Sequence, residues 1–180
     1  RAYAWVKLVK IWASLRSDDL KGIPPNLVKM IKPGMAALID RSKTSGPGKR
    51  IRWLSVFVSK ECFVVDPNWL DAGWDIWREK DFNFARDYLV PAPTEDLAGV
   101  KQVMAEYTDM AAISRKVLGQ LKELVNSEGQ WVEGPEDLLT QAATFFWTEH
   151  SERNFVNGMA ACLGIPKEQR DYLGRWMPEQ

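Results

Sequence analysis

Residues 150–153, HSER, contain the one histidine of this 180-residue chain. On a helix, His150 and Arg153 would present neighbouring side chains, because residues three apart lie on the same face. Such a pair could bind a metal, form a structural hydrogen bond or belong to a catalytic set. A metal site is disfavoured, because the sequence has no second histidine at the spacing of a zinc motif. Taken alone, the pair is better explained by a structural histidine that donates to a backbone carbonyl.

Three further residues favour a catalytic role of His150 and Arg153 over a structural one. Arg16 lies in "SLRSDDL", Lys43 in "DRSKTSG" and Trp176 in "LGRW". Each has an ordinary explanation, since an arginine between helices usually forms a salt bridge, a hairpin lysine is usually solvated and a tryptophan near a helix end is usually core. Their order along the chain is more specific: LRxxD, a hairpin lysine, HxxR and then LGxW.

In this order, the motifs resemble the catalytic domain of the tyrosine recombinases, the phage-integrase family of mobile elements. Arg16 matches the family's first catalytic arginine, and Asp19 stands where a supporting acidic residue is usual. Lys43 matches the lysine of the family's β-hairpin, and His150 and Arg153 match its HxxR pair.

The rest of the match is weaker in the middle of the chain. Trp176 takes a position that is histidine in many members and tryptophan in some, and Gly164 matches the turn after the HxxR helix. The resemblance covers roughly residues 11–178, in which residues 61–135 contribute only general helical character. It implies one catalytic domain over residues 1–180, truncated at both ends, with a family-variable middle region.

The family's nucleophile is a tyrosine that follows the Trp-or-His position, and here it would fall beyond Gln180. Tyr172 precedes Trp176 and therefore does not fit the family's order. We interpret Tyr172 as a packing residue or a phosphate contact, and we expect this fragment alone to be inactive. The start at Arg1 likewise suggests a fragment without the family's DNA-clamping helical domain.

The resemblance implies DNA strand cleavage and rejoining through a 3′-phosphotyrosyl intermediate. Arg16 and Arg153 would hold the non-bridging phosphate oxygens in a bidentate manner that an ammonium cannot provide. His150 would donate a hydrogen bond to this phosphate or shuttle the nucleophile's proton, and the Trp176 indole would add a donor. Lys43 would protonate the departing 5′ oxygen. No metal and no nucleotide cofactor are implied, since the phosphotyrosyl link conserves the bond energy.

The charge distribution fits a polyanionic partner, although the net charge of the chain is zero. Residues 1–60 hold 13 Lys and Arg against 3 acidic residues, whereas residues 61–180 hold 11 against 21. A basic segment can attract phosphate through its local field, and a solvated basic face without a ligand is the alternative. We assign double-stranded DNA as the partner and four basic residues as DNA-binding: Arg41, Lys49, Arg50 and Arg52.

No run approaches 18 apolar residues, and no signal peptide is visible, so we expect an intracellular protein. It would lie in the nucleus of a eukaryote or in the cytoplasm and nucleoid of a bacterium. The resemblance implies tetramers on DNA for the full-length protein and no small-molecule substrate. We expect this fragment to be monomeric.

The N-terminal third should position Arg16 and Lys43. Trp5, Leu8, Trp12 and Leu15 have helical spacing, which predicts an amphipathic helix with Lys7 and Lys10 off its apolar face. Ser17 is the predicted N-cap of a second short helix. The runs "LVKMI", "MAALIDRS" and "IRWLSVFV" predict a three-stranded antiparallel sheet, with a long basic hairpin loop between the last two.

The remainder of the chain is predicted to be helical. One helix is expected in "PNWLDAGWDIWRE", followed from Thr94 by helices in "TEDLAGVKQVMAEY", "MAAISRKVLGQLKELVNSEG" and "PEDLLTQAATFFW". The HSER helix should end at Gly164, and Pro166 should open a last short helix. The predicted fold class is therefore α+β and mostly α-helical.

Three functions remain open from the sequence. The first is a recombinase or integrase catalytic domain, with type IB topoisomerases as competitors that share its residues. The second is a catalytically inactive DNA-binding relative, and the third is an unrelated helical protein-interaction domain. The first two require that the five predicted catalytic residues converge on one pocket: Arg16, Lys43, His150, Arg153 and Trp176.

Overall fold

The computed structural model of the chain describes all residues except 44, 50, 63–65, 67 and 175–180. In chain order the elements are α1 (Ala2–Trp12), α2 (Ser17–Leu20), the 3₁₀ turn η1 (Pro25–Leu27), β1 (Val28–Ile31), β2 (Gly34–Ile39), β3 (Leu54–Ser59), α3 (Trp69–Arg78), β4 (Pro91–Pro93), β5 (Val100–Met104), α4 (Tyr107–Leu118), β6 (Lys122–Ser127), β7 (Gln130–Asp137), α5 (Gln141–Phe146), α6 (Glu149–Cys162) and α7 (Lys167–Gly174).

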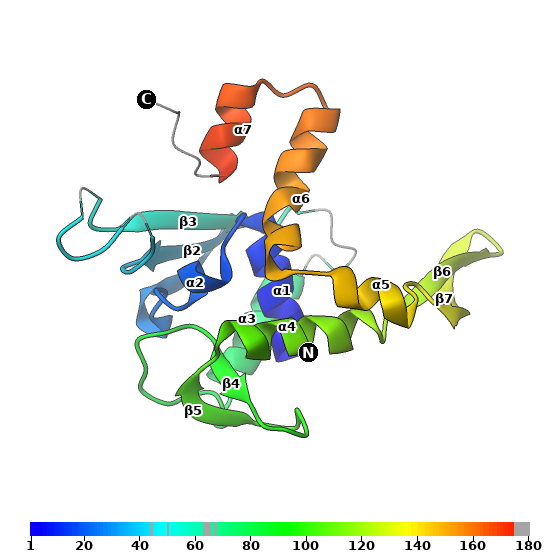
Figure 1. Cartoon of the computed structure of the whole chain (residues 1–180), viewed down its shortest axis with the longest axis horizontal. Coiled ribbons are helices and arrows are strands. Elements are labelled where there is room, and N and C mark those ends of the chain that lie inside the picture. Colours follow the sequence, from blue (N-terminus) through cyan, green and yellow to red (C-terminus); the bar gives the residue numbers. More distant parts are fainter. Residues whose placement is uncertain (44, 50, 63–65, 67, 175–180) are drawn as a thin grey trace.

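The predicted fold class is confirmed. Within the described residues, seven α-helices accompany a three-stranded sheet of order β1-β2-β3 and the two hairpins β4–β5 and β6–β7. All strand pairs are antiparallel. Figure 1 shows α1 in the middle of the molecule, with the three-stranded sheet to one side and the β6–β7 hairpin projecting from the other.

The three-stranded sheet forms from short apolar runs: the central strand β2 is apolar throughout, whereas β1 and β3 carry β-branched residues together with polar ones. Ile39 pairs with Leu54 at the end of the β2–β3 ladder, so the loop between these strands runs from residue 40 to residue 53. This is the predicted basic hairpin loop, and Lys43 lies in it. The sheet therefore holds the basic loop at its end, as predicted, but the loop is longer than the predicted "KTSGPGKR", because β2 ends at Ile39 and β3 begins only at Leu54.

The centre of the core is α1. Trp5 and Leu15 are buried, as expected for the apolar stripe. Lys7 and Lys10, predicted off this stripe, are also buried, which the sequence did not predict. The physical reason is that α6 covers this face of α1 and supplies carboxylates for both ammonium groups, as described below.

The helix predicted from Thr94 is also wrong, because this segment forms a turn and strand β5. The Thr94 hydroxyl accepts the backbone N–H of Gly99 at 2.9 Å, and the Thr94 N–H donates to the Gly99 carbonyl at 3.0 Å. These bonds close a loop instead of capping a helix. Strand β5 then pairs with β4, a partner that helical periodicity does not take into account.

The helix predicted in "MAAISRKVLGQLKELVNSEG" forms only in its first half. Helix α4 ends at Leu118, and the residues "LKELVNSEG" enter the β6–β7 hairpin instead of extending it. Glu128 and Gly129 both have positive φ, and the Asn126 side chain accepts the Gly129 N–H at 2.9 Å. This is the turn chemistry of a tight hairpin, and it overrides the helical pattern. Helix α5 consequently starts only after Thr140, its N-cap.

Other boundaries agree with the sequence. Helices α3 and α6 occupy the predicted segments, and Gly164 has the positive φ of a residue that follows a helix end. Helix α7 begins directly after Pro166. Helix α2 begins at Ser17, so the N-cap is Arg16, one residue earlier than predicted.

Gly73 in α3 allows the closest approach between α3 and α1. A Cβ atom at this position would lie 1.8 Å from Cδ1 of Trp5, which is buried. We therefore expect Gly73→Ala to lower the free energy of unfolding by about 2 kcal/mol through overpacking. Urea denaturation would measure this effect.

The matched control is Gly158→Ala in α6, where a Cβ would meet nothing within 4 Å. Alanine should there stabilise the protein by about 0.5 kcal/mol, because it reduces the entropy that the unfolded chain loses. Equal stability of the two variants would show that the contact between α1 and α3 is looser than described.

Candidate active site

One pocket of about 270 Å³ brings together residues from both ends of the chain. It is lined by Arg16, Ser17, Asp18, Lys43, Tyr107, Glu149, His150 and Arg153. Four of the five predicted catalytic residues are in this set. The fifth, Trp176, lies outside the described residues. Convergence on one pocket therefore holds for the four described residues, and their catalytic roles stay predictions.

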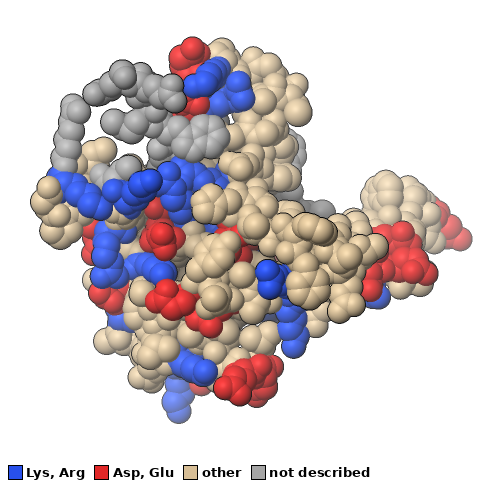
Figure 2. All heavy atoms as spheres, in the orientation of Figure 1, with Lys and Arg blue, Asp and Glu red and all other residues tan. Residues whose placement is uncertain are grey.

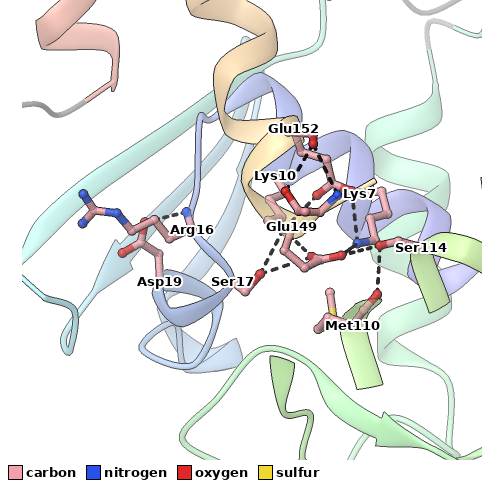
Figure 3. Close-up of polar contacts among 11 residues, drawn as sticks. Lys7, Lys10, Arg16, Ser17, Asp19, Met110, Ser114, Glu149 and Glu152 are labelled. Carbon is pink, nitrogen blue, oxygen red and sulfur yellow. Dashed lines mark hydrogen bonds and ion pairs between the residues drawn. The ribbon is translucent and has the colours of Figure 1, made fainter. Parts of the chain in front are cut away.

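Arg16 is positioned by the start of α2. Its backbone N–H donates to the Asp19 carboxylate at 2.8 Å, and the Asp19 N–H donates to the Arg16 carbonyl at 3.0 Å. Asp19 is buried, so this cap is shielded from water. Figure 3 shows that the Arg16 guanidinium points away from the buried side chains beneath it. The predicted supporting residue thus fixes the backbone of Arg16.

Lys43 is brought to the pocket by a close backbone contact between the turn that follows α2 and the β2–β3 loop. The Asp40 N–H donates to the Gly22 carbonyl at 2.8 Å, and a Cβ on Gly22 would lie 1.8 Å from the Arg41 carbonyl oxygen. Only glycine permits this approach. Lys49 donates to the carbonyls of Ser42 and Lys43, which holds the loop backbone together. Lys43 is exposed to solvent and lines the pocket.

Three predicted DNA-binding residues, Arg41, Lys49 and Arg52, lie in the same β2–β3 loop as Lys43, and the fourth, Arg50, is outside the described part of the chain. Arg41 donates to the Lys21 carbonyl at 2.8 Å and lies 3.4 Å from the Asp87 carboxylate. The Arg52 guanidinium lies 5.4 Å from the centre of the Trp53 ring, and Trp53 is 56% exposed. Figure 2 shows many Lys and Arg side chains on the side of the molecule that carries α2 and the β2–β3 loop.

His150 and Arg153 lie in the first turns of α6. The Ser151 N–H donates to the Thr148 carbonyl at 2.9 Å, which starts the helix at Glu149. His150 is exposed, so it is not a packed core histidine. Arg153 is buried and reaches the pocket from within the fold. The two side chains thus line one pocket, His150 at the surface and Arg153 from the interior.

A buried charge cluster, which no motif in the sequence indicated, lies beneath the pocket. We define this cluster as Lys7 and Lys10 of α1 with Glu149 and Glu152 of α6 (Figure 3). Lys7 contacts Glu149 Oε1 at 2.6 Å and Glu152 Oε1 at 3.1 Å. Lys10 contacts Glu152 Oε2 at 2.9 Å and pairs with Glu149 Oε2. Its sequence signal was two residue pairs at a spacing of three, one basic and one acidic.

The charge cluster strongly perturbs Glu149. Burial by itself would raise the pKa of this carboxyl, but the positive charges of Lys10 and Lys7 lower its pKa to about 2. Ser114 of α4 and Ser17 of α2 also donate to the Glu149 carboxylate. Glu149 is therefore a permanent anion at neutral pH, and its hydrogen bonds join three helices to α6.

The pocket can bind an anion through side chains of three kinds. Two guanidinium groups, one ammonium and one imidazole line it, together with the phenol of Tyr107, to which no motif in the sequence pointed. The carboxylates of Asp18 and Glu149 also line it, and Glu149 is paired with Lys7 and Lys10. Such donors suit a phosphate group held without a metal ion. Among the described residues, no group of three or more His, Cys, Asp or Glu has an arrangement that could hold a metal.

No protein-family model matches this sequence, and no curated protein matches it. Solved structures do match its fold. One is a FLP recombinase–Holliday junction complex, with a TM-score of 0.57 and 14% sequence identity over 98% of this chain and 38% of that one. The chain has a tyrosine recombinase-like fold. A mutant Flpe–DNA Holliday junction complex matches with a TM-score of 0.54 and the same identity and coverage.

The chain thus spans about 38% of the length of these neighbours. The α+β architecture that the resemblance implied is the one observed. Along the described part of the chain, no helix is both long and apolar enough to cross a membrane.

Proposed function

We propose that this chain is the catalytic domain of a DNA recombinase or integrase of the tyrosine recombinase family. Its activity would be DNA strand cleavage and rejoining through a 3′-phosphotyrosyl intermediate, with the nucleophilic tyrosine outside residues 1–180. The observation that carries the proposal is the pocket shared by Arg16, Lys43, His150 and Arg153. The likeness of the fold to recombinases solved with Holliday junctions supports it.

In this proposal, the pocket binds the scissile phosphate. The tyrosine oxygen bonds to phosphorus while the bond from phosphorus to the 5′ oxygen breaks. Arg16 and Arg153 neutralise the charge that builds on the non-bridging oxygens. His150 takes the proton of the tyrosine, and Lys43 gives a proton to the departing 5′ oxygen. Rejoining runs the same steps in reverse, so no external energy source is needed. Trp176 would add a donor to the same phosphate.

The DNA backbone would run across the basic β2–β3 loop beside the pocket. Arg41, Arg50 and Arg52 would contact its phosphates, while Lys49 would hold the loop and contribute charge. The exposed Trp53 offers a flat apolar face beside Arg52. Contacts of this kind position a protein on DNA without reading its sequence. Assembly into tetramers on paired sites belongs to the proposed family and would need the full-length protein.

Duplex DNA binding tests this proposal. We expect the affinity of the chain for a short duplex to fall steeply as salt increases, because phosphate contacts release counterions. Arg52→Ala should weaken binding to every sequence alike and reduce the slope of log affinity against log salt by about 1. Fluorescence anisotropy across a salt series would give both quantities.

The matched control is Lys122→Ala, which removes one positive charge from β6, on the hairpin that projects away from the sheet (Figure 1). Lys122 pairs with Asp137 at 2.7 Å within that hairpin. This variant should keep the wild-type slope. DNA binding that is absent or insensitive to salt would contradict the proposal and favour a protein-interaction domain.

A further inference from the structure

Lys10 has the most central place in the buried charge cluster. The residue is fully buried, and its ammonium contacts three oxygens on two other helices: it donates to Ser17 Oγ and Glu149 Oε2 and forms an ion pair with Glu152 Oε2. It lies 3.0 Å from Ser17 Oγ and 2.9 Å from Glu152 Oε2, and it pairs with Glu149 Oε2 (Figure 3). Two of the three N–H donors of the ammonium are thus used in hydrogen bonds, and the ion pair with Glu152 adds a third contact.

The partners of Lys10 share one property. Each is the immediate chain neighbour of a residue that lines the pocket: Ser17 of Arg16, Glu149 of His150, and Glu152 of Arg153. The two acidic partners are three residues apart on α6 and therefore lie on one face of that helix. Because successive residues on a helix are about 100° apart, fixing this face fixes the directions of His150 and Arg153.

The burial of these charges makes the packing of α1, α2 and α6 specific. Removing two carboxylates and two ammonium groups from water is costly, and their attraction compensates only when the geometry is good. A shift of α6 or α2 relative to α1 would separate Lys10 from at least one partner and leave a buried charge poorly paired. The cluster therefore favours one relative placement of these three helices over neighbouring ones.

We propose that Lys10 is a positioning residue that sets the geometry of Arg16, His150 and Arg153 around the phosphate. This inference rests on the proposed function, because it assumes that the pocket binds phosphate. It assigns a role in the site to a residue that is fully buried in α1 and does not line the pocket.

The chain offers a spectroscopic probe for this role. His150 is its one histidine, so the Hε1 proton of His150 gives a single imidazole signal in the NMR spectrum. Titration of the wild-type chain with inorganic phosphate at fixed pH should shift this signal to saturation. In Lys10→Met, we expect the affinity for inorganic phosphate to fall at least about tenfold, because the donors no longer converge.

Lys7→Met is the matched control. Lys7 binds the Oε1 atoms of the same two carboxylates, whereas Lys10 binds their Oε2 atoms and also Ser17. Both variants lose one buried ammonium, so a purely structural role predicts similar losses of stability and of phosphate affinity. We expect similar losses of stability but a clearly smaller loss of affinity in Lys7→Met.

A second variant covers the case in which Lys10→Met does not fold. Lys10→Met with Glu152→Gln removes one charge of each sign and leaves the pair of Lys7 and Glu149 in place. It should fold, as judged by its backbone NMR spectrum, and should still bind phosphate weakly. Wild-type affinity in either folded Lys10 variant would overturn the inference. A wild-type His150 signal that ignores phosphate would instead overturn the phosphate site itself, and the inference with it.

Discussion

Arg153→Lys should lower the rate of DNA cleavage by at least about 10²-fold in a form of the protein that carries the nucleophilic tyrosine. Arg153 is buried and lines the pocket, so lysine would keep the positive charge there. It would lose the planar fork that, in the proposed function, holds two phosphate oxygens in a bidentate manner. The measurement is the rate at which a covalent adduct forms on a nicked suicide substrate.

Arg78→Lys is a suitable control for this substitution. Arg78 lies in the last turn of α3 and is exposed, 3.9 Å from Asp75. This variant should form the adduct at the wild-type rate. An unchanged rate in Arg153→Lys would show that the guanidinium does not act on the phosphate, and would support a different use of the pocket.

Residues 1–180 alone serve as a negative control in the same assay, because the proposed nucleophile lies outside them. Tyr172 is exposed on α7 and does not line the pocket that holds the arginines. An adduct formed by residues 1–180 would contradict the assignment of the nucleophile. It would direct attention to Tyr107, the tyrosine that lines the pocket.

Glu149→Gln should lower the free energy of unfolding at pH 7 by on the order of 3 kcal/mol. The substitution removes a buried negative charge and leaves Lys7 and Lys10 with one carboxylate between them. The low pKa of Glu149, about 2, expresses the same interaction. Urea denaturation of the two proteins at neutral pH would measure the difference.

The same pair of proteins should differ in their response to acid. Because the folded-state pKa of Glu149 lies below its ordinary value of 4.5, its contribution to stability is fully present above pH 4.5 and is lost as the pH falls to about 2. The stability difference between wild type and Glu149→Gln should therefore shrink across this interval.

The control for Glu149→Gln is Glu106→Gln, at an exposed ion pair in which Glu106 lies 2.7 Å from Lys21. An exposed pair contributes less than about 1 kcal/mol, so this variant should stay close to wild type. Equal effects of the two substitutions would show that burial of the charge cluster does not strengthen its ion pairs.

Local patterns in the sequence predicted the elements whose formation depends on near neighbours. The short apolar runs of β1, β2 and β3, the amphipathic pattern of α3 and the stop at Gly164 each depend on residues a few positions apart. The candidate site residues Arg16, Lys43, His150 and Arg153 could likewise be selected from the sequence, because the order of their motifs is visible without the fold. The strands between Thr94 and Asp137 could not be predicted from the sequence, because strand pairing and turns override a helical period there.

By itself, the sequence determined the α+β class, the N-terminal sheet and the candidate phosphate-binding residues. Only the tertiary structure decided that four of these residues share one pocket, and that Lys7 and Lys10 are buried beneath it. A lysine on an amphipathic helix is expected in water, since burying its charge unpaired is costly. The carboxylates that make burial possible are 139 residues or more away along the chain, so no local pattern contains them.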